Sequence, residues 1–232
     1  MSIARFKDLC VDVNSVGPMA EFWGKVLGLA APADHPADEP VPLRGDSPAK
    51  TVWINPVPEP RTVKQRVHLD VHTESIAALE KLGATMQSPI TDEQSWAVME
   101  DPEGGELCGF PRDSVPAYRL MEVVVDSADP EGQARWWQRV VGGDLGQEDG
   151  KPYCWLENVP GLPFKYWVFI SVPEPKTVKN RIHWDVTADA LQPVLDAGAT
   201  LLRAQDDEIG WHVCADPEGN EFCVFLPTTK DN

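Results

Sequence analysis

The chain has 232 residues, of which 42% are hydrophobic and 25% charged, a balance typical of a folded protein and not of a disordered one. Its net charge of −17 disfavours nucleic acids and anionic membranes as partners, because both are negatively charged. No stretch approaches the roughly 18 consecutive apolar residues of a membrane span, and the first residues lack a signal-peptide pattern. Five cysteines without CxxC spacing argue against a disulfide framework, so we expect a cytoplasmic protein.

The strongest pattern in the sequence is an internal repeat. Residues 57–110 begin VPEPRTVKQRVHLDV and end DPEGGELCGF, and residues 172–225 begin VPEPKTVKNRIHWDV and end DPEGNEFCVF. The two stretches align without a gap and agree at almost half of their positions. Upstream of them, Trp23 falls on Trp137 and Gly28 on Gly142. Two homologous domains, residues 1–113 and 114–232, are the simplest interpretation.

Each half divides again into two units that begin with a strand and a helix. In the first half, alternating or apolar segments predict strands, and a stripe from Met19 to Leu27 predicts an amphipathic helix. A second helix is expected at 75–82, and the strands at 6–13, 41–43, 51–55, 66–71, 85–90, 96–100 and 106–110. Strands that both open and close each unit indicate an α+β fold and not a doubly wound parallel sheet.

Two stretches at equivalent places do not fit this pattern. Residues 30–50 are rich in proline and acids, and residues 143–165 are rich in Gly, Pro and Asp. Each is interpreted either as a disordered connector or as a lid over a binding site.

Period-two alternation places the polar residues of the opening strands on one face. Asp8, Cys10 and Asp12 share a face, and His68 shares one with Asp70. The second half repeats the pattern with Glu122, Asp126, His183 and Asp185. Since His and Cys accompany the charges in both halves, we expect the polar face to enclose a ligand; a solvated outer face is the alternative.

These motifs resemble the vicinal-oxygen-chelate (VOC) superfamily, which includes glyoxalase I, bleomycin-resistance proteins and extradiol dioxygenases. The phrases VPEPKTVKNRIHWDV, DPEGNEFCVF, AEFWGKVLGL and ARWWQRVVGG, found together in order, resemble its glyoxalase-like branch, which is common in bacteria. The resemblance covers nearly the whole chain, twice. It implies two tandem VOC domains, each of two βαβββ modules that form a cup-shaped, mostly antiparallel sheet with helices outside and a ligand site inside.

The resemblance also implies where catalytic or metal-ligating residues lie. Family members that use a metal take ligands from the first and last strands of each module, which here places Asp8, His68, Glu122 and His183 in that role. A glutamate is usual on the last strand, where this chain has cysteine, so the ligand set is incomplete. Without a metal, His68 would act with Asp8, or His183 with Glu122, as a general acid–base pair. No cofactor is certain; a divalent metal (Zn, Fe, Mn or Ni) is compatible with these donors.

Further polar and aromatic residues on these faces are candidates for ligand binding. The arginines would either meet an anionic ligand or neutralise nearby acids, the tryptophans would stack on a planar ligand, and the cysteines would act as nucleophiles or simply pack. These candidates are Arg66, Asp70, Trp96, Glu106, Cys108, Arg181, Asp185, Trp211, Glu221 and Cys223.

Three functions follow from the sequence. The first is a protein that binds a small organic ligand in a sheet-lined cavity, sequestering or carrying it without catalysis. The second is a divalent-metal-dependent lyase, isomerase or dioxygenase of the glyoxalase type, and the third is a non-catalytic scaffold. The expected partner is a small molecule, and the chain is expected to be a monomer or a homodimer.

Overall fold

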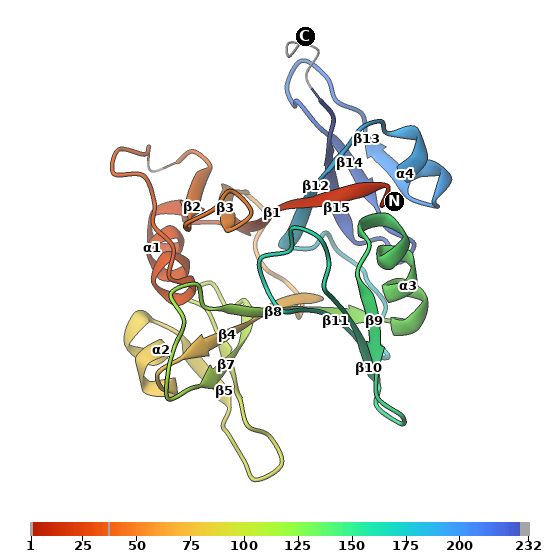
Figure 1. Cartoon of the computed structure of the whole chain (residues 1–232). Coiled ribbons are helices and arrows are strands. Elements are labelled where there is room, and N and C mark those ends of the chain that lie inside the picture. Colours follow the sequence, from red (N-terminus) through yellow and green to blue (C-terminus); the bar gives the residue numbers. More distant parts are fainter. Residues whose placement is uncertain (1, 37, 228–232) are drawn as a thin grey trace.

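The computed structural model describes residues 2–36 and 38–227, which form four helices and fifteen strands (Figure 1). The expected α+β class and the tandem arrangement are confirmed, and both sheets are mostly antiparallel and open. The first half contributes β1 (Ala4–Val13), α1 (Val16–Leu27), β2 (Val41–Arg44), β3 (Thr51–Pro56), β4 (Val67–Thr73), α2 (Ile76–Leu82), β5 (Thr85–Ser88), β6 (Ala97–Glu100) and β7 (Glu106–Pro111). The second half contributes β8 (Leu120–Ser127), α3 (Pro130–Val141), β9 (Asp144–Gln147), β10 (Tyr153–Glu157), β11 (Tyr166–Ser171), β12 (Ile182–Ala188), α4 (Gln192–Asp196), β13 (Thr200–Arg203), β14 (His212–Ala215) and β15 (Glu221–Phe225).

Each sheet combines one module from each half. The seven-stranded sheet has the order β13-β14-β15-β12-β1-β3-β2, and the eight-stranded sheet has the order β5-β6-β7-β4-β8-β11-β10-β9. Within each sheet the two modules meet at an antiparallel pair of strands. These pairs are β1 with β12 in the seven-stranded sheet and β4 with β8 in the eight-stranded sheet. The two modules of one half therefore lie in different sheets, which differs from the expected pairing of consecutive modules. Hydrophobic periodicity identifies the modules but carries no signal for which of them share a sheet.

The core lies between the two sheets and contains α1 and α3. Trp137 of α3 packs against Trp167 from the eight-stranded sheet and against Trp184 and Phe222 from the seven-stranded sheet, with ring centroids 4.9 to 5.2 Å apart. The α1 helix contacts β3 of one sheet and β4 of the other, and its Trp23 is fully buried. Because the apolar faces of both sheets are buried here, their polar faces point away from this core.

The repeated DPEG turns join modules from opposite sides of the core. The Glu103 carboxylate accepts hydrogen bonds from the backbone N–H groups of Asn14 and Ser15 at 2.7 to 3.0 Å, where α1 begins. Glu218 does the same for the residues before α3, at 2.8 to 3.2 Å. Each glutamate thus satisfies backbone donors at a helix N-terminus, where a carboxylate is also favoured by the helix dipole.

One glycine is required by a close approach between the halves. Gly28 ends α1 with φ 70°, and a Cβ there would collide with the backbone carbonyl oxygen of Ala117. Its left-handed conformation also suits glycine, so this position fixes where the second half starts against α1.

The two unusual stretches differ in structure. Residues 143–165 contain β9 and β10, which extend the eight-stranded sheet, so neither a lid nor a disordered connector describes them. In residues 30–50, β2 forms at Val41 and an isolated bridge joins Ala30 to Arg44. Among the described residues, none of the helices has the length and apolar character needed to cross a bilayer.

Candidate functional site

Polar side chains converge at the seam of the seven-stranded sheet, where the first strand of the chain meets β12. The register of β1 and β12 sets Asp8 opposite Asp185 and Cys10 opposite His183. On the other side of β12, β15 sets Cys223 opposite Asp185. We call Asp8, Cys10, His183, Asp185 and Cys223 the terminal cluster, because they come from the two ends of the chain (Figure 1).

The terminal cluster is compact and buried. One donor atom from each of Cys10, His183 and Asp185 lies within 4.8 Å of the others, and none of the cluster's side chains is more than 9% exposed. The Lys7 ammonium lies 2.7 Å from Asp8 Oδ2 and 3.8 Å from Asp185 Oδ2. Polar groups that the sequence places on one strand face are therefore enclosed, and not solvated.

A matching group lies at the seam of the eight-stranded sheet. The register of β4 with its neighbours sets Asp70 opposite Glu122 on β8 and opposite Cys108 on β7. His68 Nε2 lies 3.4 Å from Asp70 Oδ1, and donor atoms of His68, Asp70 and Cys108 lie within 4.8 Å of one another. We call His68, Asp70, Cys108 and Glu122 the middle cluster; Glu122 and His68 are half-buried and the other two are buried.

Burial shifts the protonation of both clusters toward neutral forms. It raises the pKa of Asp185 and Asp70 well above the ordinary range, and a neighbouring carboxylate, Asp8 or Glu122, adds to the effect. Burial also lowers the pKa of His68 to about 4, helped by the Lys64 ammonium, and lowers that of His183. The imidazoles are consequently neutral at pH 7 and able to accept a proton or a metal ion.

The thiols behave in the same way. Burial, reinforced by the negative charge of Asp70 for Cys108 and of Asp185 for Cys223, raises the pKa of each well above that of an ordinary thiol. The same causes raise the pKa of Cys10. A protonated buried thiol is a poor nucleophile, so the nucleophilic role considered for Cys108 and Cys223 has no support here.

Several buried polar atoms of the terminal cluster have no hydrogen-bond partner within the described residues. They are Asp8 Oδ1, Asp185 Oδ1 and His183 Nδ1. Leaving such atoms unpaired costs free energy, and a cation or a polar ligand would satisfy them. Carboxylate, imidazole and thiolate donors at these separations fit zinc, so the residues present can hold a divalent metal ion.

The structure reassigns the acid–base pairs expected from the sequence. The expectation that His68 lies beside Asp8 is wrong, because they belong to different sheets. For the same reason His183 does not lie beside Glu122. Asp8 lies instead on the strand next to His183, and Glu122 on the strand next to His68. The acids and imidazoles form two separate clusters, and not one shared chamber.

Other candidates hold the framework together. Glu106 forms an ion pair with Arg61 at 2.5 Å, and Glu221 forms one with Lys176 at 2.7 Å. Each ion pair holds the connector that leads into β4 or β12 against the last strand of the same module. Arg66 donates to the backbone carbonyl oxygens of Glu174 and Asp126. Arg181 likewise donates to the backbone carbonyl oxygens of Asp12 and Glu59.

The two tryptophans before the DPEG turns stack on protein side chains. Trp96 stacks on Phe110 with centroids 5.5 Å apart, and Trp211 stacks on Phe225 at 5.4 Å. Each ring therefore has one face covered by the last strand of its own module, and stacking on a planar ligand stays a prediction for the other face.

Two members of the site were not selected from the sequence. Cys10 shares the face of Asp8, so alternation could have identified it. Lys7 could not be identified in this way, because strict alternation places it on the opposite face from Asp8. A register shift between Phe6 and Asp8 lets its ammonium reach the Asp8 carboxylate.

Comparisons with known proteins agree with this fold. The family model described as a glyoxalase-like domain matches residues 8–110 and again 122–225. The structure is similar to glyoxalase I from Zea mays, with a TM-score of 0.68 and 13% identity over 96% of this chain and 92% of that one. It is also similar to a putative dioxygenase from Bacillus subtilis, with a TM-score of 0.64 and 12% identity over 97% of this chain and 86% of that one. No curated protein matches the chain in sequence. At these identities the structural likeness establishes the fold alone.

Proposed function

The chain belongs to the glyoxalase-like domain family, and from that premise we propose that its polar sheet faces bind a divalent metal ion together with a small oxygen-bearing organic ligand. The observation that carries this proposal is the convergence of Cys10, His183 and Asp185 in a buried cluster with unpartnered polar atoms. Among common metals, zinc matches this donor set best.

Within the terminal cluster the roles divide by chemistry. Cys10, His183 and Asp185 would hold the metal, which when bound supplies a Lewis acid for an oxygen-bearing ligand. Lys7 lies between the two opposed carboxylates and offsets their charge. In the middle cluster His68, Asp70 and Cys108 would hold a second ion.

We propose binding without metal-free acid–base catalysis, on the basis of the protonation states. A general base works best with a pKa near the pH at which it acts, and the pKa of about 4 for His68 is far below neutrality. Metal-free acid–base catalysis by His68 is therefore disfavoured. A low imidazole pKa does suit a metal ligand, which must be deprotonated.

The test is metal analysis of protein purified without chelator and without a histidine tag. We expect zinc to be retained and to raise the melting temperature when added to metal-stripped protein. The double variant His183→Ala/Asp185→Ala should lose one site and His68→Ala/Asp70→Ala the other, while the control His35→Ala, at a half-buried histidine that belongs to neither cluster, should lose neither. No retained metal and no thermal shift with Zn, Fe, Mn or Ni would contradict the proposal and leave the scaffold function.

We also propose a cytoplasmic location and a small molecule as the partner, with no role for nucleic acid or membranes. All five cysteines are free and buried, which suits a reducing compartment. The net charge of −17 opposes polyanions. A monomer is supported by the topology, since each sheet is completed by modules of the same chain.

A further inference from the structure

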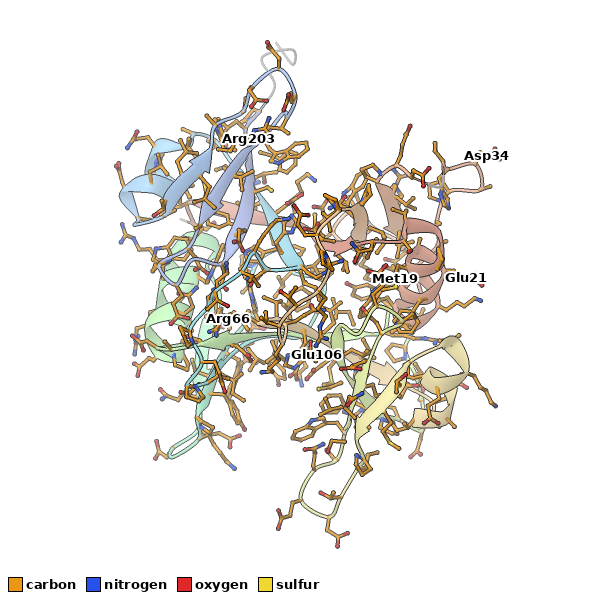
Figure 2. The ribbon with its side chains drawn as sticks, turned by 180° about the vertical axis from the view of Figure 1, so that it is seen from behind. Met19, Glu21, Asp34, Arg66, Glu106 and Arg203 are labelled. Atoms are coloured by element: carbon orange, nitrogen blue, oxygen red, sulfur yellow. The ribbon has the colours of Figure 1, made fainter. Side chains whose placement is uncertain are left out.

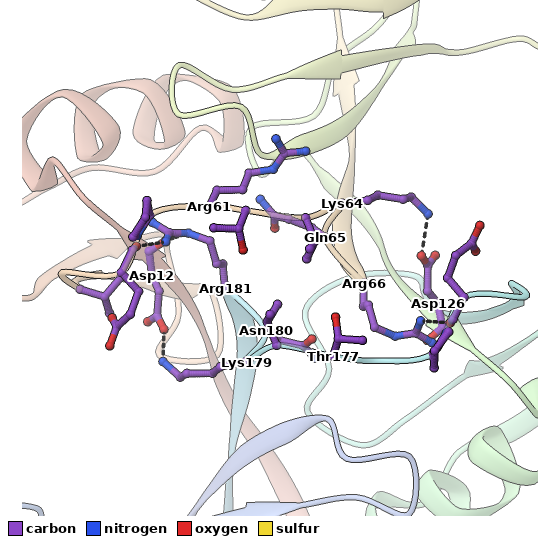
Figure 3. Close-up of a pocket in the computed structure, with 18 residues that line it drawn as sticks. Asp12, Arg61, Lys64, Gln65, Arg66, Asp126, Thr177, Lys179, Asn180 and Arg181 are labelled. Atoms are coloured by element: carbon purple, nitrogen blue, oxygen red, sulfur yellow. Dashed lines mark hydrogen bonds and ion pairs between the residues drawn. The ribbon is translucent and has the colours of Figure 1, made fainter.

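A cavity of about 680 Å³ lies between the two halves, and none of its lining residues belongs to either cluster. Its walls are the connectors 57–66 and 174–181, which lead into β4 and β12 and face each other across an approximate two-fold axis (Figure 3). Asp12 and Asp126 close its two sides. The volume is that of a site for a small organic molecule.

The same repeated motif builds both walls of this connector cavity. VPEPRTVKQR supplies one wall and VPEPKTVKNR the other, so that Val63 and Val178 occupy equivalent places. Both valines are unusually exposed for their type, at 41% and 43%. Together with Pro60 and Pro175 they leave an apolar lining uncovered, and apolar surface gathered in a cavity marks a binding site more often than scattered apolar residues do.

The acids that line the two sides are already neutralised. The Lys64 ammonium lies 2.6 Å from Asp126 Oδ2, and Lys179 forms the equivalent ion pair with Asp12. The other two lining carboxylates, Glu59 and Glu174, are exposed, so solvent screens them.

Arg66 is the cation of this cavity that keeps its charge available. Its guanidinium donates to the carbonyl oxygens of Glu174 at 2.5 Å and Asp126 at 2.7 Å, and among the described residues no carboxylate lies within 4.0 Å of it. The equivalent Arg181 has a carboxylate partner, Glu103, at 3.3 Å. The two-fold arrangement is thus broken in charge, and the positive end is at Arg66, whose side chain is labelled in Figure 2.

We propose that the connector cavity binds an amphipathic organic anion, a carboxylate with an aliphatic body. The aliphatic part lies against Val63 and Val178, where it removes apolar surface from water, and the carboxylate lies at Arg66. In a chain of net charge −17, Arg66 gives such a ligand a cation that no carboxylate of the described residues already pairs. Its lining shares no residue with the two clusters, although Lys64 acts on the pKa of His68 and Lys179 on that of His183.

The proposal is tested by calorimetric titration of the full chain with octanoate and with 1-octanol. Octanoate should bind one per chain, at least about tenfold more tightly than 1-octanol, and more weakly as salt is added. The variant Val63→Asp/Val178→Asp should lose at least about tenfold in affinity, while the control Ile90→Asp/Leu202→Asp, at comparably exposed positions, should not.

Further measurements separate loss of ligand binding from loss of folding and from effects of the terminal cluster. Melting temperatures of both variants within a few degrees of the parent establish that they fold, and Arg66→Lys, which keeps the charge, should retain more affinity than Arg66→Gln. Binding of octanoate to His183→Ala/Asp185→Ala should be unchanged, which separates this site from the terminal cluster. Equal affinity for octanoate and 1-octanol, binding unaffected by Val63→Asp/Val178→Asp, or a parent dimer that only this variant dissociates would overturn the proposal.

Discussion

Asp8 and Asp185 lie directly opposite each other on adjacent antiparallel strands, and both are buried. Two carboxylates in this position cannot both ionise without cost, and the pKa of Asp185 is accordingly raised well above its ordinary range. Lys7 offsets part of the charge from one side. A buried pair of acids of this kind is costly to keep unless something binds to it.

Replacing one acid should separate stability from binding. We expect Asp185→Asn to stabilise metal-free protein by up to about 1 kcal/mol at pH 7.5, because it removes the cost of keeping a second buried carboxyl opposite the Asp8 carboxylate. The same variant should lose most of the thermal shift produced by zinc. Urea unfolding with and without zinc measures both effects, and a variant less stable than the parent in both conditions would show that Asp185 serves packing only.

The glutamates of the DPEG turns should matter for stability and not for the clusters. Glu103→Ala removes the acceptor for two backbone donors at the start of α1, and Glu218→Ala does so at α3, so each should cost about 1 to 2 kcal/mol. Glu80→Ala, on the exposed side of α2, is the control and should cost little. Urea unfolding curves give the comparison. Equal losses for Glu80→Ala and Glu103→Ala would refute the capping role.

Most of the fold could be predicted from the sequence, because its strands and helices follow local periodicity. The stripe from Met19 to Leu27 is α1, and the alternation at Asp8 to Val13 is β1. What could not be predicted is the partner of each module. The free edge of β4 could form backbone hydrogen bonds with β1 or with β8. Its pairing with β8 depends on how the two sheets pack around α1 and α3, which are distant in the sequence.

That choice leads to a prediction about the isolated halves. Residues 1–113 contain β1 and β4 without their partners β12 and β8, so both strands would present unpaired edges. We expect this fragment to be a dimer or poorly folded, and not a stable monomer. Light scattering and circular dichroism would decide. A monomeric fragment with native-like cooperativity would contradict the cross-half pairing.

The candidate site was predictable in its residue types but not in its grouping. Alternation correctly places Asp70 with His68, since both lie on β4. It cannot tell that Asp8 meets Asp185 from the far end of the chain, because that contact depends on the pairing of β1 with β12. Lys7 reaches Asp8 because of a register shift between β1 and β12, and no local pattern in this sequence predicts that shift.

Stability should rise as the pH is lowered from about 7 toward about 5. Burial raises the pKa of Asp101 and Asp216 to about 6, against about 3.9 in an unfolded chain. Between these values the folded state binds more protons than the unfolded state, so stability is greatest at low pH and is lost as pH rises through about 6. His68 acts in the opposite direction, because its pKa is about 4 in the folded protein and about 6.5 in the unfolded chain. Below about pH 6.5 the unfolded chain binds a proton that the folded protein does not, which lowers the free energy of unfolding.

These contributions can be separated with two variants. Asp101→Asn keeps the oxygen that accepts the N–H groups of Glu103 and Gly105, so it should gain about 1 to 3 kcal/mol at pH 7.5 and show a flatter pH dependence. His68→Gln should make the rise in stability toward pH 5 steeper, because the opposing imidazole is gone. Calorimetric melting temperatures at pH 5 and pH 7.5 provide the measurement. If Asp101→Asn melted below the parent at pH 7.5, with the parent slope unchanged, the pKa of Asp101 would not be raised by folding and the assigned sign would be wrong.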